Sequence, residues 1–191
     1  MLKTELKLSL RGMDMVIFSI CMPIVVLVAI GVIYGNKPAF EGANYTFLEQ
    51  SFGAITSIAI CAGGVMGLPL VVSDYRSKHI LKRFKVTPVD PIVILLVEVT
   101  IYALYSLVSM SSLFLVAKLF FKFNMQGNIF NFILGWLLVM ISMFSIGIMV
   151  GGISKDSKIA GVIASVLYFP MLIFSGATIP YEVMPNIMKN I

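Results

Sequence analysis

Long apolar runs separated by short polar loops dominate the chain. A membrane-spanning helix needs about 20 mostly apolar residues, and five runs meet this length, at residues 15–34, 52–72, 92–117, 128–150 and 159–179. Their apolar residues follow one another without alternation, as in Ile24–Ile30, whereas the strands of a membrane barrel alternate apolar and polar positions. The pattern predicts an all-α integral membrane protein with a bundle of about five transmembrane helices.

Composition supports lipid as the surrounding solvent. Of the 191 residues, 59% are hydrophobic and 12% are charged, and the mean hydropathy is +1.01. A soluble domain has about 45–50% apolar and about 25% charged residues, and a chain this short cannot hide the excess in one core. We find no repeat, linker or low-complexity tract, so residues 1–191 are interpreted as a single transmembrane domain.

Few residues could carry catalysis or bind a metal. Cys21 and Cys61 both lie inside apolar runs, and His79 is the single histidine, so no metal is expected and packing explains the thiols better. Serines occur within the runs, but no base accompanies them, which disfavours an intramembrane enzyme. No Gly-x-x-x-x-Gly-Lys-Ser/Thr motif occurs, so the chain is not expected to hydrolyse nucleotides itself.

The basic residues of the loops predict the orientation in the membrane. Ten of them lie in the N-terminal tail and in the second and fourth loops, and four lie in the other segments: Lys37, Lys118, Lys122 and Lys189. Cytoplasmic loops are enriched in lysine and arginine, so the N-terminus is expected in the cytoplasm, and five spans would leave the C-terminus outside. Topology thereby explains the net charge of +5, and no nucleic-acid partner is expected.

Residues 1–14 have the pattern of an amphipathic helix. Leu2, Leu6, Leu10 and Met13 recur at helical spacing, beside a basic stripe of Lys3, Lys7 and Arg11. Such a helix lies in the membrane interface with its apolar face toward the acyl chains. We favour a lipid anchor, and a docking surface for a cytoplasmic partner is the alternative.

The second loop, residues 73–91, carries a further amphipathic pattern. Asp74 or Ser77 could cap a short helix that Thr87-Pro88 would end, with Ile80, Leu81 and Phe84 on one face. Basic residues occupy the rest of its surface: Lys78, Lys82, Arg83 and Lys85. A helix of this kind, parallel to the membrane, could transmit force, whereas a loop that only fixes the orientation needs the charges alone.

Two segments resemble motifs of the type-2 ABC exporter permeases. The first comprises Leu68-Pro69, Asp74-Tyr75-Arg76, Leu81-Lys82-Arg83-Phe84 and Thr87-Pro88-Val89. The second comprises Phe169-Pro170, Phe174-Ser175-Gly176, Ile179-Pro180 and Met184-Pro185. The resemblance covers most of the chain. Ser77 replaces the usual glutamate, His79-Ile80 replace Gly-Thr, and the sequence stops where the family continues into a sixth span, so we expect a fragment or a truncated relative.

The resemblance implies a transport subunit with six spans and both ends cytoplasmic, in the plasma membrane of a bacterium. Two permeases, identical or different, would pair above two ATPase subunits, which would bind the ATP and Mg²⁺; this chain would bind no cofactor. The residues implied to couple to the ATPase are Tyr75, Arg76, Ser77, Lys78, Ile80, Leu81, Lys82, Arg83, Phe84, Thr87 and Pro88. An extracellular-side turn is implied at Pro170, Ser175, Gly176, Pro180 and Pro185.

Glu98 is the one ionisable residue well inside an apolar run, and such a carboxylate is a candidate functional site. It lies about 9 Å from the cytoplasmic edge of its run, at 1.5 Å per residue, so we expect partial hydration and either structural pairing, a helix-end role or proton transfer. A secondary transporter or channel would depend on Glu98 and is the first alternative to an ATP-driven exporter. A non-transporting immunity or sensor protein is the second.

Small residues at four-residue spacing predict close contact between helices. They occur in the second, fourth and fifth runs, at Ala59, Gly63, Gly67, Gly147, Gly151, Gly161 and Ser165. Pro23 and Pro170 interrupt the first and fifth runs, and Pro170 with Ser175-Gly176 could form a kink or a re-entrant turn.

Overall fold

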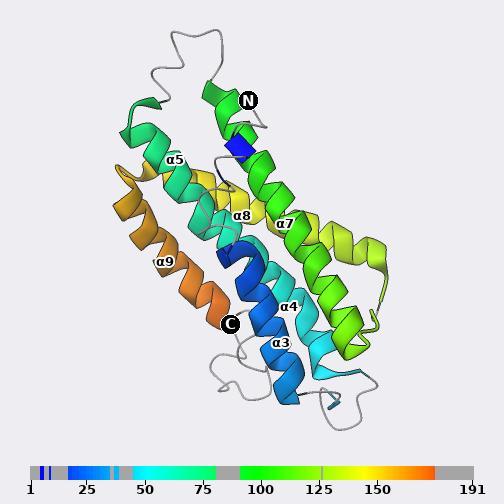
Figure 1. The fold of residues 1–191 in the computed structure, drawn as a ribbon. Coiled ribbons are helices and arrows are strands. Elements are labelled where there is room, and N and C mark those ends of the chain that lie inside the picture. The colour runs from blue at the N-terminus through cyan, green and yellow to red at the C-terminus, as the bar shows by residue number, and fades with distance from the viewer. Residues whose placement is uncertain are drawn as a thin grey trace.

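The protein is a bundle of helices (Figure 1). The computed structural model describes residues 5, 6, 9, 17–34, 37, 38, 45–80, 91–125 and 127–174. Its elements are η1 (Ile17–Cys21), α3 (Met22–Tyr34), α4 (Phe47–Cys61), η2 (Ala62–Gly67), α5 (Leu68–Ser77), α7 (Pro91–Phe121), α8 (Ile129–Ile153) and α9 (Ser157–Phe174). Within these ranges the only β pairing is an isolated bridge between Pro38 and Thr46. The predicted all-α class is confirmed.

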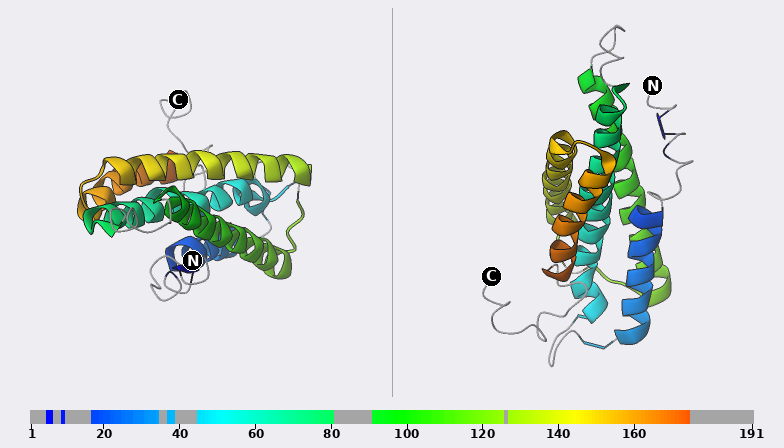
Figure 2. Two further views of the ribbon diagram at one scale, coloured as in Figure 1. Left: turned by 90° about the horizontal axis from the view of Figure 1, so that it is seen from above. Right: turned by 90° about the vertical axis from the view of Figure 1, so that its left-hand side faces the viewer.

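One long helix forms the axis of the bundle. α4, η2 and α5 follow one another without a break from Phe47 to Ser77. The two views in Figure 2 show α8 and α9 on one side of this central helix and α3 and α7 on the other. In the most apolar 18-residue window of the central helix, 78% is buried, against 44% in the corresponding window of α7 and 22% in that of α8. The central helix is therefore enclosed by protein, whereas α8 presents most of its surface outward.

Among the described residues, three helices are long and apolar enough to cross a membrane. They are Phe47–Ser77, Ile92–Phe121 and Ile129–Ile153, and two shorter apolar helices lie at Ser19–Tyr34 and Ser157–Ile173. The second predicted run, 52–72, is thus part of a longer helix. Residues 73–77, which were expected to begin a loop, form its last turn. Hydropathy marks the part of a helix that lies in lipid, and polar residues can continue the helix beyond it.

A capping box begins the central helix. The backbone N–H of Glu49 donates to the Thr46 hydroxyl (3.3 Å), and the N–H of Thr46 donates to the Glu49 carboxylate (2.9 Å). This reciprocal pair satisfies two backbone donors that a helix start leaves free. The other Glu49 oxygen accepts from the backbone N–H of Asn124 at 3.1 Å. One side chain therefore fixes the start of α4 and holds the connection between α7 and α8 beside it.

One residue separates the end of each π-helical segment from a proline. η1 is followed by Met22-Pro23 and η2 by Leu68-Pro69. Proline has no N–H and its ring collides with the preceding turn, and one wider turn can accommodate it within a continuous helix. At η2 the N–H of Leu68 donates to the carbonyl of Gly63, five residues back. The helix thus passes Pro69 without a loop. In α9, Pro170 also lies inside the helix, which continues to Phe174.

Glycines bring α8 close to the central helix. A Cβ atom added to Gly147 would collide with the carbonyl oxygen of Gly64, and one added to Gly151 would lie 2.7 Å from the Cβ of Val72. Phe144 fills the neighbouring space, since its ring would lie 2.7 Å from a Cβ at Gly64. The small residues predicted at 147 and 151 therefore do lie at a helix contact, and Gly161 also faces α5, at Leu70.

The bundle has two ends with distinct residues. At the end that holds Tyr75, α5 stops, α7 starts, and α8 connects to α9 beside Lys155 and Lys158. At the end that holds Glu49, α3 and α7 stop near Lys37, Lys118 and Lys122. The described basic residues are thus divided between the ends as the loops predict, and the assignment of the Tyr75 end to the cytoplasm stays a prediction.

We predict that Gly147→Ala destabilises the fold by about 1–3 kcal/mol, the usual cost of overpacking. The new methyl group meets backbone at Gly64 and can be accommodated only if α8 shifts. The measurement is the free energy of unfolding in mixed micelles. Gly152→Ala on the same helix is the control, because a Cβ there has nothing within 4 Å. Equal stability of the two variants would contradict the close contact.

Candidate functional site

The candidate site lies at the end of the central helix, where the segment that resembles the exporter motif begins. Tyr75, Arg76 and Ser77 form the last turn of α5, and the chain turns at Lys78 and His79. His79 has a positive φ of 56°, a left-handed conformation that commonly ends helices. Ile80 is the last residue described before the gap at 81–90. Six of the predicted coupling residues lie outside the described ranges: Leu81, Lys82, Arg83, Phe84, Thr87 and Pro88.

Asp74 does not cap a new helix, as one interpretation of the loop expected. It lies inside α5, where its carbonyl accepts from the N–H of Lys78 (3.0 Å) and from the hydroxyl of Ser77 (3.1 Å). The Asp74 carboxylate forms an ion pair with Lys78 at 2.8 Å. Its second oxygen accepts from the hydroxyl of Ser157, the first residue of α9, at 3.4 Å. Asp74 therefore connects α5 to α9.

Tyr75 connects α5 to two other segments. Its hydroxyl oxygen lies 3.0 Å from Oε1 of Glu98 on α7 and 3.0 Å from Oε2 of Glu5 in the N-terminal segment. The depth of Glu98 in its apolar run suggested partial hydration. In the structure Glu98 is 4% exposed, so the folded chain encloses its carboxyl group. Of the roles considered for Glu98, the geometry provides a structural pairing with Tyr75.

The N-terminal segment touches the bundle at further points. Ser9 lies one helical turn after Glu5, and the hydroxyl of Tyr105 on α7 donates to the Ser9 hydroxyl at 2.8 Å. Leu6 packs against a buried cluster that includes Leu68, Val72 and Ile101. At least this leucine of the amphipathic tail packs on protein, whereas the favoured interpretation placed the apolar face in lipid.

Glu5, Ser9, Tyr105 and Ser157 escaped the sequence analysis. The sequence holds a weak indication of these contacts. Glu5 and Ser9 are four residues apart and lie beside Leu6 in the sequence, so the three residues can share one face of a helix. On α7, Glu98, Tyr102 and Tyr105 likewise recur at helical spacing. The second set is polar on a largely apolar helix, the first lies in an amphipathic segment, and only the folded structure shows that the two sets face each other.

The predicted extracellular-side turn is only partly described. Pro170 lies within α9, which carries no break at this residue. Ser175, Gly176, Pro180 and Pro185 lie outside the described residues.

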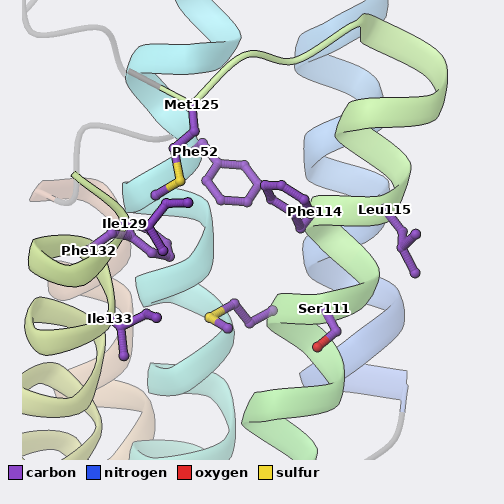
Figure 3. Close-up of a pocket in the computed structure, with 9 residues that line it drawn as sticks. Phe52, Ser111, Phe114, Leu115, Met125, Ile129, Phe132 and Ile133 are labelled. Carbon is purple, nitrogen blue, oxygen red and sulfur yellow. The ribbon is translucent and has the colours of Figure 1, made fainter. Parts of the chain in front are cut away.

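A separate cavity lies toward the Glu49 end, between α4, α7 and α8. It has a volume of about 310 Å³, and Figure 3 shows Phe52, Phe114 and Phe132 among its lining side chains. Ser111 is the one hydroxyl residue of the lining, and it donates to the carbonyl of Leu107 at 2.8 Å. The cavity is thus apolar and suits a hydrocarbon group, with no group in its lining for acid–base chemistry.

The described polar interactions at the Tyr75 end are hydrogen bonds and the Asp74–Lys78 ion pair. Among the described residues, no group of three or more His, Cys, Asp or Glu side chains could hold a metal ion. The arrangement instead joins segments, since two consecutive residues of α5 reach the N-terminal segment, α7 and α9. Such an arrangement can position the helix end and pass on its displacement.

Comparison with known proteins defines the class. The family model of the ABC-2 type transporters matches residues 1–191. The chain belongs to this family, and is a multi-pass membrane protein. It is 29% identical over 117 residues to the inner membrane transport permease YhhJ of Escherichia coli (strain K12), and equally to that of Shigella flexneri. Each match covers 61% of this chain and 31% of the relative. No solved structure matches significantly.

We predict that Asp74 is coupled more strongly to Ser157 than to Lys78. Double-mutant cycles with alanine should give about 0.5–1 kcal/mol for Asp74 and Ser157, and about 0.3–0.5 kcal/mol for the exposed Asp74–Lys78 pair. Substitution of Asp74 alone also removes an aspartate from the C-terminus of a helix, where a negative charge is unfavourable. The double-mutant cycle cancels this contribution and leaves the coupling energy of the pair. Both coupling energies are measured by unfolding in mixed micelles. A larger coupling energy for Asp74 and Lys78 than for Asp74 and Ser157 would show that Asp74 stabilises only the end of α5 and does not connect it to α9.

Proposed function

We propose that this chain is the transmembrane subunit of an ATP-driven exporter, energised by a separate ATPase that docks on the segment after α5. The observation that carries the proposal is the connection of this helix end to the rest of the bundle. Asp74 reaches α9 through Ser157, and Tyr75 reaches α7 through Glu98. Any partner that moves the segment after His79 would therefore act on three helices together.

Family membership and the sequence support the same mechanism. The segment resembles the coupling motif of type-2 exporters, and its Ile80, Leu81 and Phe84 would form the apolar face that enters a groove of the ATPase. The chain has no nucleotide-binding motif, so ATP and Mg²⁺ would bind to the partner. Two permease copies, or this chain with a different permease, would enclose the path of the substrate. Export as the direction of transport rests on the resemblance to the exporter motif, with the Tyr75 end expected in the cytoplasm.

The dominant link between the loop and the bundle would be packing. α5 packs on both α8 and α9, and close-packed interiors transmit displacement because they have little free volume. Each hydrogen bond at Asp74 or Tyr75 contributes only about 1 kcal/mol. We infer that these bonds fix the rotation of α5, so that closure of the ATPases lifts the central helix along its axis as a rigid rod.

We expect the tagged protein to co-purify with an ATPase from its native membrane, and the variant Ile80→Ala/Leu81→Ala/Phe84→Ala to lose it. The reason is that three apolar anchors of a small interface carry most of its binding energy. The measurement is mass spectrometry of the purified complex, with recovery judged by peptides that contain a nucleotide-binding motif.

The matched control is Leu134→Ala/Leu138→Ala/Ile141→Ala, which removes three exposed apolar side chains from the outward face of α8. This variant should keep the ATPase. If the wild-type protein recovers none, the exporter proposal fails, and a channel, a secondary transporter or a sensor replaces it. If both variants lose the ATPase alike, the docking site lies elsewhere.

A further inference from the structure

The Tyr75 hydroxyl is held between two carboxyl groups that are far apart in the sequence. Glu5 lies 70 residues before Tyr75, and Glu98 lies 23 residues after it. Both oxygen–oxygen distances are 3.0 Å, within the upper part of the range for O–H···O hydrogen bonds. The three side chains form a single row that joins the N-terminal segment, α5 and α7.

This row cannot form with both carboxyl groups ionised. A tyrosine hydroxyl has one proton and can donate to one acceptor, and an ionised carboxylate only accepts. With two carboxylates, one of the two contacts would bring lone pairs together at 3.0 Å. One additional proton resolves the conflict: a protonated carboxyl donates to the tyrosine oxygen, and the tyrosine proton goes to the other carboxylate.

In the described part of the chain, no cationic side chain pairs with Glu5 or Glu98, so none could replace the shared proton. Among the described residues, the ionisable groups that face the row are its own three members and Tyr102, which lies one turn beyond Glu98 on α7. Neither Glu5 nor Glu98 has an ion pair within the described ranges, where Lys78 pairs with Asp74. Two carboxyl groups that share one proton are a known arrangement in proteins, because close like charges disfavour each other.

The row also lies where aqueous protons can reach it. If the apolar run 52–72 fills the hydrocarbon, Tyr75 is three residues beyond its end, or about 4–5 Å at 1.5 Å per residue. Tyr75 is half-buried and Glu98 is enclosed beneath it. The N-terminal segment covers the site through Glu5, and Ser9 and Leu6 hold it at two neighbouring points.

We propose that Glu5, Tyr75 and Glu98 form a proton-dependent latch, in which one shared proton docks the N-terminal segment onto α5 and α7. Protonation favours the docked segment, because only then are both hydrogen bonds of Tyr75 made. As pH rises and the shared proton leaves, one contact becomes repulsive and the segment is released from α5. Since docking stabilises the protonated form, docking and proton binding are linked in both directions. The proposal does not depend on the exporter function.

Glutamine variants test the proton directly. Glu98→Gln and Glu5→Gln each replace the acid by an amide, whose N–H can donate to the Tyr75 oxygen at any pH. The protein in lipid nanodiscs should show the infrared carbonyl band of a protonated carboxylic acid at neutral pH. This band should be lost in each of the two variants, because the remaining carboxylate then accepts from Tyr75 without a proton of its own.

Hydrogen exchange tests the docking. The protection factors of backbone amides in peptides containing Glu5 and Ser9 should fall about tenfold or more in Tyr75→Phe, and in the wild type at alkaline pH. Protection in the two glutamine variants should stay within about threefold of the docked wild type and should not change with pH. Protection factors are used because they remove the pH dependence of the exchange chemistry itself.

Tyr34→Phe is the matched control, since it removes a tyrosine hydroxyl at the opposite end of the bundle, where the ring packs 4.3 Å from Phe47. It should leave both readouts unchanged. An acid band that is absent from the wild type, or that survives in both glutamine variants, would overturn the shared proton. Unchanged protection in Tyr75→Phe would overturn the latch. If Tyr75→Phe does not fold, the infrared band and the pH dependence of the glutamine variants decide.

Discussion

The fold depends on a central helix whose backbone hydrogen bonds must be satisfied within the helix. Lipid offers no partner for a free N–H or C=O group, so a break in the middle of a span is costly. Pro69 threatens such a break, and the wide turn of η2 avoids it, with Leu68 bonded to Gly63. The glycines of η2 also let α8 approach to backbone contact. One segment thus accommodates the proline and forms the closest helix contact.

The length of this helix determines what it can connect. Its 31 residues extend about 46 Å at 1.5 Å per residue, whereas the hydrocarbon core of a bilayer is about 30 Å thick. The helix therefore projects beyond the lipid and carries Asp74 and Tyr75 with it. Polar side chains that would cost free energy inside the hydrocarbon core can be hydrated at this position beyond it. The polar contacts of Asp74 and Tyr75 lie at this end for that reason, and those of Glu49 lie at the opposite end, toward the apolar cavity.

The sequence predicted the features that depend on composition and periodicity. Continuous apolar runs identified the helices, and the positions of Gly147 and Gly151 indicated a close contact that the structure places against α5 and η2. The end of α5 was placed too early, because hydropathy falls at Ser73 while the helix continues to Ser77. Polar residues at an interface are compatible with either helix or loop, and their sequence alone does not distinguish the two.

Composition and periodicity could not predict the hydrogen bonds between side chains of distant segments. Glu98 was found because a carboxylate is unusual in an apolar run, but its partners Tyr75 and Glu5 lie in segments where polar residues are ordinary. The amphipathic pattern of the tail drew attention to its leucines and lysines and away from Glu5 and Ser9. Only the fold reveals that Glu5 contacts Tyr75 on α5 and that Ser9 contacts Tyr105 on α7. Periodicity identifies the face of a helix, and the opposing element decides what that face contacts.

Asp74 and Tyr75 point to different neighbours because consecutive residues of a helix are turned by about 100° from each other, at 3.6 residues per turn. One therefore reaches α9 and the other reaches α7 without any bend in the chain. A rotation of α5 that shortened the Tyr75–Glu98 contact would move Asp74 relative to Ser157 as well. The two hydrogen bonds together fix the rotation of the helix, while packing against α8 fixes its distance from the bundle. A displacement at His79 is then constrained to follow the helix axis, which is the direction in which the central helix can act on the opposite end.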